Sequence, residues 1–167
     1  MNENHEIIVA LDVPSAAEAA AAVREIGDAV SFYKVGLELF VADGPAVLDM
    51  LKGEGKRIFL DLKLHDIPRT VERAVASCLK FGVELLTLHA SGSKAMIAAA
   101  AQAVREAGSG TRLLAVTVLT SMDQSDLDLL GVTRSMQAQV AALGTMAIAA
   151  GAHGLVCSPQ EVAALRR

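Results

Sequence analysis

The chain has 167 residues, of which 53% are hydrophobic, so one domain with a large apolar core is expected. Its net charge is −4 and its basic residues are scattered, which argues against a nucleic-acid partner. Its two cysteines lack metal-ligand spacing and residues 1–6 do not resemble a signal peptide, so we expect a cytoplasmic protein. No uncharged apolar run reaches about 18 residues, so we expect no membrane partner.

Short apolar runs alternate along the chain with amphipathic or alanine-rich stretches. The apolar runs have the length of buried strands, which we expect at residues 7–11, 30–37, 57–64, 85–89, 113–119 and 154–157. The stretches between them predict helices at residues 14–25, 44–52, 67–80, 93–106, 136–149 and 159–167. Residues 121–135 are expected to form a loop.

This alternation is a βα repeat of about 25 residues, which predicts a parallel sheet. An open doubly wound sheet and a barrel both fit the order of elements. The Gly-rich fingerprint of dinucleotide-binding folds is missing after the first strand, where residues 12–15 read Asp-Val-Pro-Ser. The polar candidates stand at the C-terminal ends of strands, where βα barrels hold their active sites. We therefore expect an α/β fold of the parallel (βα)8 TIM-barrel type, as a single domain over residues 1–167 with about six βα units present.

Residues 61–70, Asp-Leu-Lys-Leu-His-Asp-Ile-Pro-Arg-Thr, form the most charged motif at a strand end. Because side chains alternate across a strand, Asp61, Lys63 and His65 are expected on one face, opposite a face of aliphatic residues. Asp66 follows, and Pro68 is a helix-start signal. Charges at the end of a buried strand are costly unless they are paired. The motif is therefore either a structural ion pair or part of an active site.

Four further residues are candidates, each with a structural alternative. Lys34 lies in the middle of an apolar strand, where it is either a partner of acidic groups or an exposed edge-strand lysine. Asp12 either belongs to the site or only forms a turn. His89 fits best as a hydrogen-bonded structural histidine. Thr120 either binds a ligand from a loop or caps a helix.

Four segments together resemble the orotidine 5′-phosphate decarboxylase family, in register along the whole chain. They read Ile-Val-Ala-Leu-Asp, Tyr-Lys-Val-Gly, the ten-residue motif and Leu-Thr-Ser, at residues 8–12, 33–36, 61–70 and 119–121. The Asp-x-Lys-x-x-Asp core alone is shared with metal-dependent sugar-phosphate lyases, of the 3-keto-L-gulonate 6-phosphate decarboxylase and hexulose-phosphate synthase types. The Ile-Pro-x-Thr continuation and the Lys34 strand favour the orotidine enzyme.

The resemblance implies a carboxy-lyase that converts orotidine 5′-monophosphate to UMP, the last step of de novo pyrimidine nucleotide biosynthesis, without a metal or organic cofactor. Lys63 would be the proton donor within a charge array of Lys34, Asp61, Lys63 and Asp66. A homodimer is implied, in which Asp66 and Thr70 reach the partner's site. The residues implied to bind the nucleotide are Asp12, Lys34, Asp61, Leu62, Lys63, Leu64, His65, Asp66, Ile67, Pro68, Arg69, Thr70 and Thr120.

The sequence departs from the family in its length. A closed barrel has eight βα units in typically about 250 residues, whereas six units are predicted here. In the family, the C-terminal part supplies a glutamine and an arginine that bind the substrate phosphate, and units seven and eight are missing from this sequence. Two alternatives therefore accompany the main reading, namely a metal-dependent sugar-phosphate lyase of the same superfamily and an inactive barrel fragment.

Overall fold

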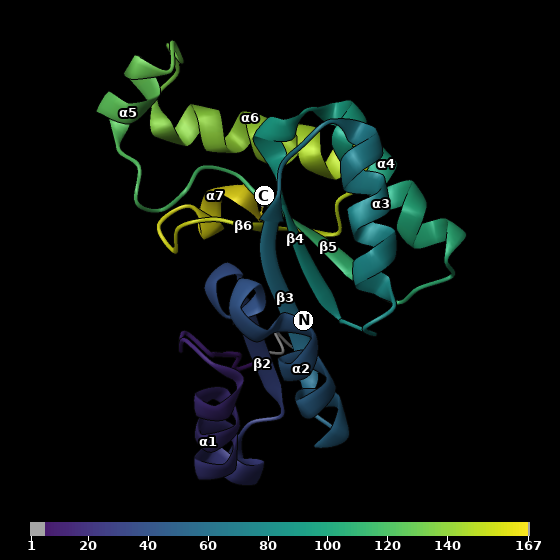
Figure 1. Cartoon of the computed structure of the whole chain (residues 1–167). Coiled ribbons are helices and arrows are strands. Elements are labelled where there is room, and N and C mark those ends of the chain that lie inside the picture. Colours follow the sequence, from purple (N-terminus) through teal and green to yellow (C-terminus); the bar gives the residue numbers. More distant parts are fainter. Residues whose placement is uncertain (1–5, 167) are drawn as a thin grey trace.

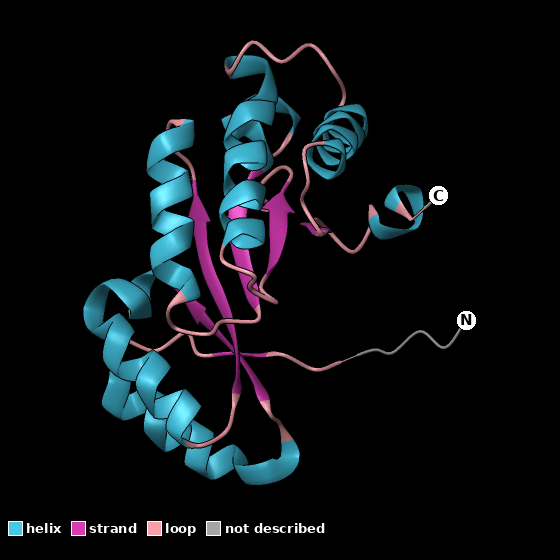
Figure 2. Ribbon diagram, turned by 90° about the vertical axis from the view of Figure 1, so that its right-hand side faces the viewer, coloured by secondary structure: helices cyan, strands magenta, loops and turns pink. Residues whose placement is uncertain are grey.

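The computed structural model describes residues 6–166, in which six parallel strands form a curved sheet with the larger helices packed along one side (Figures 1 and 2). The strands lie side by side in chain order, from β1 to β6. An open doubly wound sheet reverses its strand order at a switch point, and this sheet does not, so the prediction of a βα barrel is confirmed as a partial barrel. The strands are β1 Val9–Ala10, β2 Phe32–Gly36, β3 Arg57–Leu64, β4 Leu85–His89, β5 Arg112–Val116 and β6 Gly154–Val156.

Helices connect the strands, as expected for a βα repeat. The helices are α1 Ala16–Ile26, α2 Leu37–Gly53, α3 Pro68–Leu79, α4 Lys94–Glu106, α5 Gln124–Leu129, α6 Met136–Ala149 and α7 Val162–Leu165, with short 3-10 helices η1 Gly27–Ala29 and η2 Ala90–Gly92. None of the helices in residues 6–166 combines the length and the apolar character that crossing a membrane requires.

The structure corrects several predicted boundaries. The first, second, fifth and sixth strands are shorter than their apolar runs, because ladder pairing covers only part of each run. Helix α2 begins at Leu37 rather than at residue 44, and it continues through Pro45 across a kink at Asp43, whose φ and ψ are −142° and 25°. The kink accommodates a proline ring, which does not fit a regular helix interior.

The prediction of a loop over residues 121–135 is wrong in part, because this segment contains helix α5. Asp123 caps this helix with its side chain, and the Asp126 side chain accepts a hydrogen bond from the Asp123 backbone in return. This reciprocal pair is a capping box, formed here by two aspartates instead of the usual Ser or Thr with Glu. The last helix begins at Val162 rather than at residue 159, and its predicted end at residue 167 lies outside the described residues.

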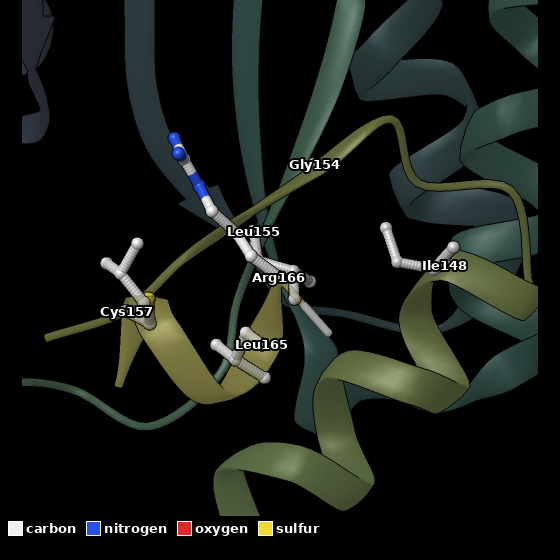
Figure 3. A pocket seen from close by; sticks show the side chains of 7 residues that line it. Ile148, Gly154, Leu155, Cys157, Leu165 and Arg166 are labelled. Carbon is white, nitrogen blue, oxygen red and sulfur yellow. The ribbon is translucent and has the colours of Figure 1, made fainter. Parts of the chain in front are cut away.

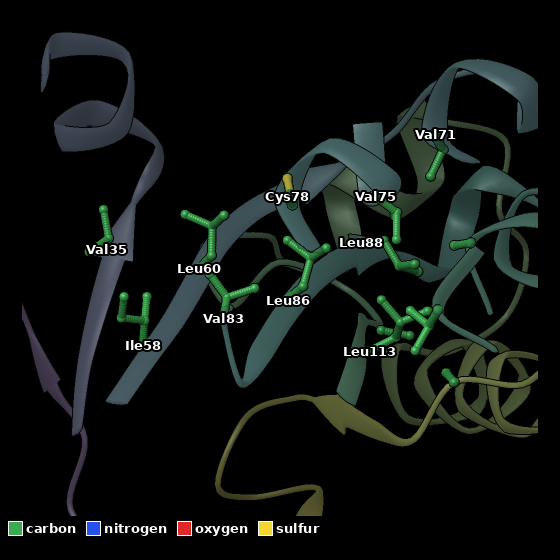
Figure 4. Close-up of a cluster of buried hydrophobic side chains, with 14 of the residues drawn as sticks. Val35, Ile58, Leu60, Val71, Val75, Cys78, Val83, Leu86, Leu88 and Leu113 are labelled. Carbon is green, nitrogen blue, oxygen red and sulfur yellow. The ribbon is translucent and has the colours of Figure 1, made fainter. Parts of the chain in front are cut away.

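The core lies between the sheet and its covering helices. Leu60, Leu86 and Leu88 of strands β3 and β4 are completely buried, and Val71 and Val75 of α3 are at most 1% exposed (Figure 4). Burying one such side chain contributes about 1.5–3 kcal/mol. Strand β3 and helix α3 both contribute to this one buried cluster, so residues 65–67, which connect them, are anchored at both ends.

Strand β6 is an edge of the sheet, and an apolar groove of about 450 Å³ lies beside it (Figure 3). Its lining comes from β6, α6 and α7 and includes Leu155, Ile148 and Leu165. The other edge is β1. The groove and the site described next are therefore separate regions of the molecule.

Candidate active site

Strands β1, β2 and β3 bring four charged side chains together at their C-terminal ends. The Lys34 ammonium lies 3.1 Å from Asp12 Oδ1 and 3.7 Å from Asp61 Oδ2. The Lys63 ammonium lies 2.9 Å from the same Asp61 oxygen. Strand pairing explains the approach, because Ala10 lies opposite Lys34 and because β2 pairs with β3. The result is a row of alternating charges in the order Asp12, Lys34, Asp61 and Lys63.

Burial changes along this row. The side chain of Asp61 is 12% exposed, whereas those of Lys34 and Lys63 are 22% and 37% exposed. A buried carboxylate is stable only when it is paired and hydrogen-bonded, and Asp61 meets both conditions. Lys63 is the more exposed of the two lysines that contact Asp61, so its ammonium is better placed to reach a bound ligand.

A buried threonine, Thr87 of β4, completes the bonding of Asp61. Its hydroxyl donates to Asp61 Oδ1 at 2.9 Å and accepts a hydrogen bond from the Lys63 backbone N–H at 2.9 Å. Thr87 is not among the site residues predicted from the sequence. The available signal was a single polar residue inside the apolar run of β4, two positions before His89 and hence on the same face of the strand.

Asp66 does not join the row within one chain. Its carboxylate accepts a hydrogen bond from the Ile67 backbone N–H at 2.6 Å, and the residue is exposed. Thr70 and Arg69 are also exposed near the start of α3, and Pro68 is the first residue of that helix. Leu62 and Leu64 are partly buried and pack against the core. The predicted charge array therefore forms from Lys34, Asp61 and Lys63, with Asp12 as its fourth member in the single chain.

His65 and His89 form a pair of rings at the ends of β3 and β4. Their centroids are 5.3 Å apart at an angle of 40°. Burial lowers the pKa of His89, and the nearby charges of His65 and Lys63 lower it further. Both rings line a cavity of about 350 Å³, whose other walls include Thr117 and apolar residues near α5 and α6. His89 therefore faces a cavity next to the charged row.

Thr120 lies apart from the charged residues. It is exposed and lines a different cavity of about 230 Å³ together with Ser158 and Glu161. Asp123, not Thr120, caps the helix that follows, so the capping alternative for Thr120 is wrong. Among residues 6–166, no three His, Cys, Asp or Glu side chains converge as a set of metal ligands.

A parallel βα half-barrel with charged side chains at the C-terminal ends of its strands has the layout of a βα-barrel enzyme. A model of the "Orotidine 5'-phosphate decarboxylase / HUMPS family" matches residues 5–167. The chain belongs to this family, so the resemblance found in the sequence is confirmed. The predicted carboxy-lyase class is confirmed with it.

Individual relatives extend beyond this chain. The orotidine 5′-phosphate decarboxylase of Anaeromyxobacter sp. (strain K) is 49% identical over 166 residues, which are 99% of this chain and 72% of the relative. The enzyme of the same name from Alcanivorax borkumensis is 46% identical over 167 residues, which are 100% of this chain and 72% of the relative. The crystal structure of orotidine 5′-phosphate decarboxylase from Lactobacillus acidophilus superposes with a TM-score of 0.90 at 38% identity, and covers 98% of this chain and 75% of that one.

Proposed function

We propose that this chain decarboxylates orotidine 5′-monophosphate to UMP, with Lys63 as the proton donor and without a cofactor. The observation that carries the proposal is the Lys63 ammonium, held 2.9 Å from Asp61 Oδ2 at the C-terminal end of β3. Membership of the family and identities of 46–49% with enzymes named orotidine 5′-phosphate decarboxylase support the same reaction. The product places the reaction at the end of de novo pyrimidine nucleotide biosynthesis.

The chemistry explains why an ammonium is needed. When the bond from C6 of the pyrimidine to the carboxylate breaks, CO₂ leaves and the electron pair remains in an in-plane orbital at C6. No adjacent carbonyl can delocalise that pair, so the protein must stabilise it electrostatically. The Lys63 ammonium would approach C6 as the charge develops and would then transfer a proton to it. Solvent returns the proton to the lysine. A compact cation with movable donors suits this role better than a guanidinium.

The other members of the row would support Lys63. The negative charge of Asp61 stabilises the ammonium and holds it in place. Lys34 offsets the charge of Asp61 and would contact the ribose together with Asp12. Asp66 is proposed to complete the row from a second subunit, and Thr70 to bind nucleotide there. Both are exposed near the start of α3, where the apolar Ile67 is also 67% exposed, as a contact surface would require.

The remaining residues of the proposed nucleotide site follow this row along β3 and into the start of α3, and Thr120 joins them from a separate cavity. The residues proposed to bind the nucleotide are those of segment 61–70, with Asp12, Lys34 and Thr120. We also propose that residues 1–167 act as one βα-barrel domain in a cytoplasmic homodimer. The free cysteines Cys78 and Cys157 suit a reducing compartment.

The test is a decarboxylation assay on purified chain, by loss of orotidine 5′-monophosphate absorbance, with and without EDTA, together with calorimetric binding of UMP. We expect turnover that EDTA does not change. No loss of orotidine 5′-monophosphate, together with turnover of a sugar phosphate that EDTA abolishes, would instead favour the metal-dependent sugar-phosphate lyase, because that reaction needs a divalent ion to hold an enediolate. A folded chain that neither binds UMP nor turns over substrate would favour the inactive barrel fragment, an alternative that the 72% coverage of the relatives motivates.

A further inference from the structure

Thr87 is a buried hydroxyl that links the side chain of Asp61 to the backbone of Lys63. Its Oγ donates to Asp61 Oδ1 and accepts from the Lys63 N–H, each at 2.9 Å. A hydroxyl has one proton and two lone pairs, so it can satisfy both partners at once. Thr87 is 0% exposed, so water does not compete for these contacts.

The backbone of β3 shows why a side chain is needed at this point. Leu60 lies opposite Leu86 and Leu64 lies opposite Leu88, so a step of four residues on β3 matches a step of two on β4. Lys63 lies inside this irregular stretch with φ at 51°, a conformation that lysine rarely adopts. The Thr87 hydroxyl gives the displaced Lys63 N–H a partner, and an N–H left unpaired at this partly buried position would be destabilising.

The same hydroxyl fixes the orientation of the Asp61 carboxylate. With Oδ1 held by Thr87, Oδ2 is directed to the ammonium groups of Lys63 and Lys34, at 2.9 and 3.7 Å. Rotating the carboxylate would break three contacts together. A charged group held in this way needs no reorganisation when charge develops on a ligand.

We propose that Thr87 is a positioning residue for proton transfer. Through one hydroxyl it holds both the Asp61 carboxylate and the turned backbone of Lys63 in the arrangement that protonation of C6 requires. Thr87 does not touch the substrate, because it is fully buried, and it acts through its two partners. This inference rests on the function proposed above for Lys63.

The test compares three variants of the full chain. Thr87→Val removes the hydroxyl at nearly constant shape, and Thr87→Ser retains it. Thr111→Val is the matched control, because Thr111 is 3% exposed and donates its hydroxyl to the Val83 carbonyl at 2.6 Å, at the N-terminal end of β5. It loses a comparable buried hydrogen bond away from the site.

We expect Thr87→Val to lower kcat by about 10- to 100-fold and to change the affinity for UMP by less than about threefold. The reason is that misplacing Asp61 and Lys63 slows proton transfer more than it weakens nucleotide binding. Thr87→Ser should restore kcat to within about threefold of the unmodified chain, and Thr111→Val should leave kcat unchanged. The proposal is overturned if Thr87→Val keeps kcat within about threefold of the unmodified chain, or if Thr87→Ser does not restore kcat. It is also overturned if Thr111→Val loses as much activity as Thr87→Val.

A second measurement does not depend on turnover. Amide hydrogen exchange at Lys63, followed by NMR, should be at least about tenfold faster in Thr87→Val than in the unmodified, Thr87→Ser and Thr111→Val chains. Unchanged exchange in Thr87→Val would overturn the positioning role. If the unmodified chain shows no decarboxylation, the proposed function fails, whereas the exchange result still decides whether Thr87 holds the Lys63 backbone.

Discussion

Replacing Asp61 by asparagine is the most direct test of the charge row, because it removes one negative charge and changes the shape of the side chain little. Asp61 Oδ2 lies 2.9 Å from the Lys63 ammonium and 3.7 Å from that of Lys34. At an effective dielectric constant of about 20, each contact amounts to about 4–6 kcal/mol of gross Coulomb attraction. Desolvation and screening offset much of it, and loss of one partner from a hydrogen-bonded charge pair typically costs about 2–5 kcal/mol.

We expect about 2–4 kcal/mol of this loss to appear in the transition state, which corresponds to a fall in kcat of about 30- to 1,000-fold. UMP carries no developing charge at C6, so its affinity should change by less than about fivefold. The assay is steady-state decarboxylation together with calorimetric binding of UMP.

The matched control for this experiment is Asp28→Asn. Asp28 also lies 3.7 Å from a lysine ammonium, that of Lys56, but it is fully exposed and outside the site. Its substitution should leave kcat unchanged. If Asp61→Asn retained more than about a third of kcat, or if kcat and UMP affinity fell in equal proportion, Asp61 would not stabilise the transition state.

Three further predictions concern single residues. Lys63→Ala should reduce kcat to less than about a hundredth while circular dichroism and thermal unfolding stay close to those of the unmodified chain; a higher kcat would exclude Lys63 as the proton donor. Asp66→Asn should form active sites with Lys63→Ala chains when the two variants are mixed, because each dimer of one chain of each variant would contain one intact site; no recovered activity would contradict the contribution in trans. The hydrogen bond from Arg57 lowers the pKa of Glu84, so this carboxylate stabilises the fold above its unfolded pKa and the contribution is lost as the pH falls through the folded pKa. The difference in Tm between the unmodified chain and Glu84→Gln should therefore be largest near neutral pH and shrink below about pH 4.5; a constant difference would contradict this.

The fold could be predicted because its signals are local. Each strand of a parallel sheet is an apolar run, and several of the helices that follow these runs have a start signal, such as Pro68 in α3. Boundaries failed where tertiary contacts decide them. The Asp43 carboxylate accepts a hydrogen bond from the backbone N–H of Ala16 at 2.9 Å, so the kink in α2 is tied to the start of α1, a contact that no local signal announces.

The sequence predicted only the part of the site that follows from the alternation of side chains along a regular strand. Asp61 and Lys63 are two apart, and their pairing follows from one motif. Thr87 belongs to the next strand, and its contact with Lys63 depends on the positive φ of that lysine and on the register shift beside it. A regular β3 would have given the Lys63 N–H a backbone partner and left the Thr87 hydroxyl facing Asp61 alone. The feature that the sequence hides is therefore an irregularity of the backbone, and it occurs at the lysine on which the proposed chemistry depends.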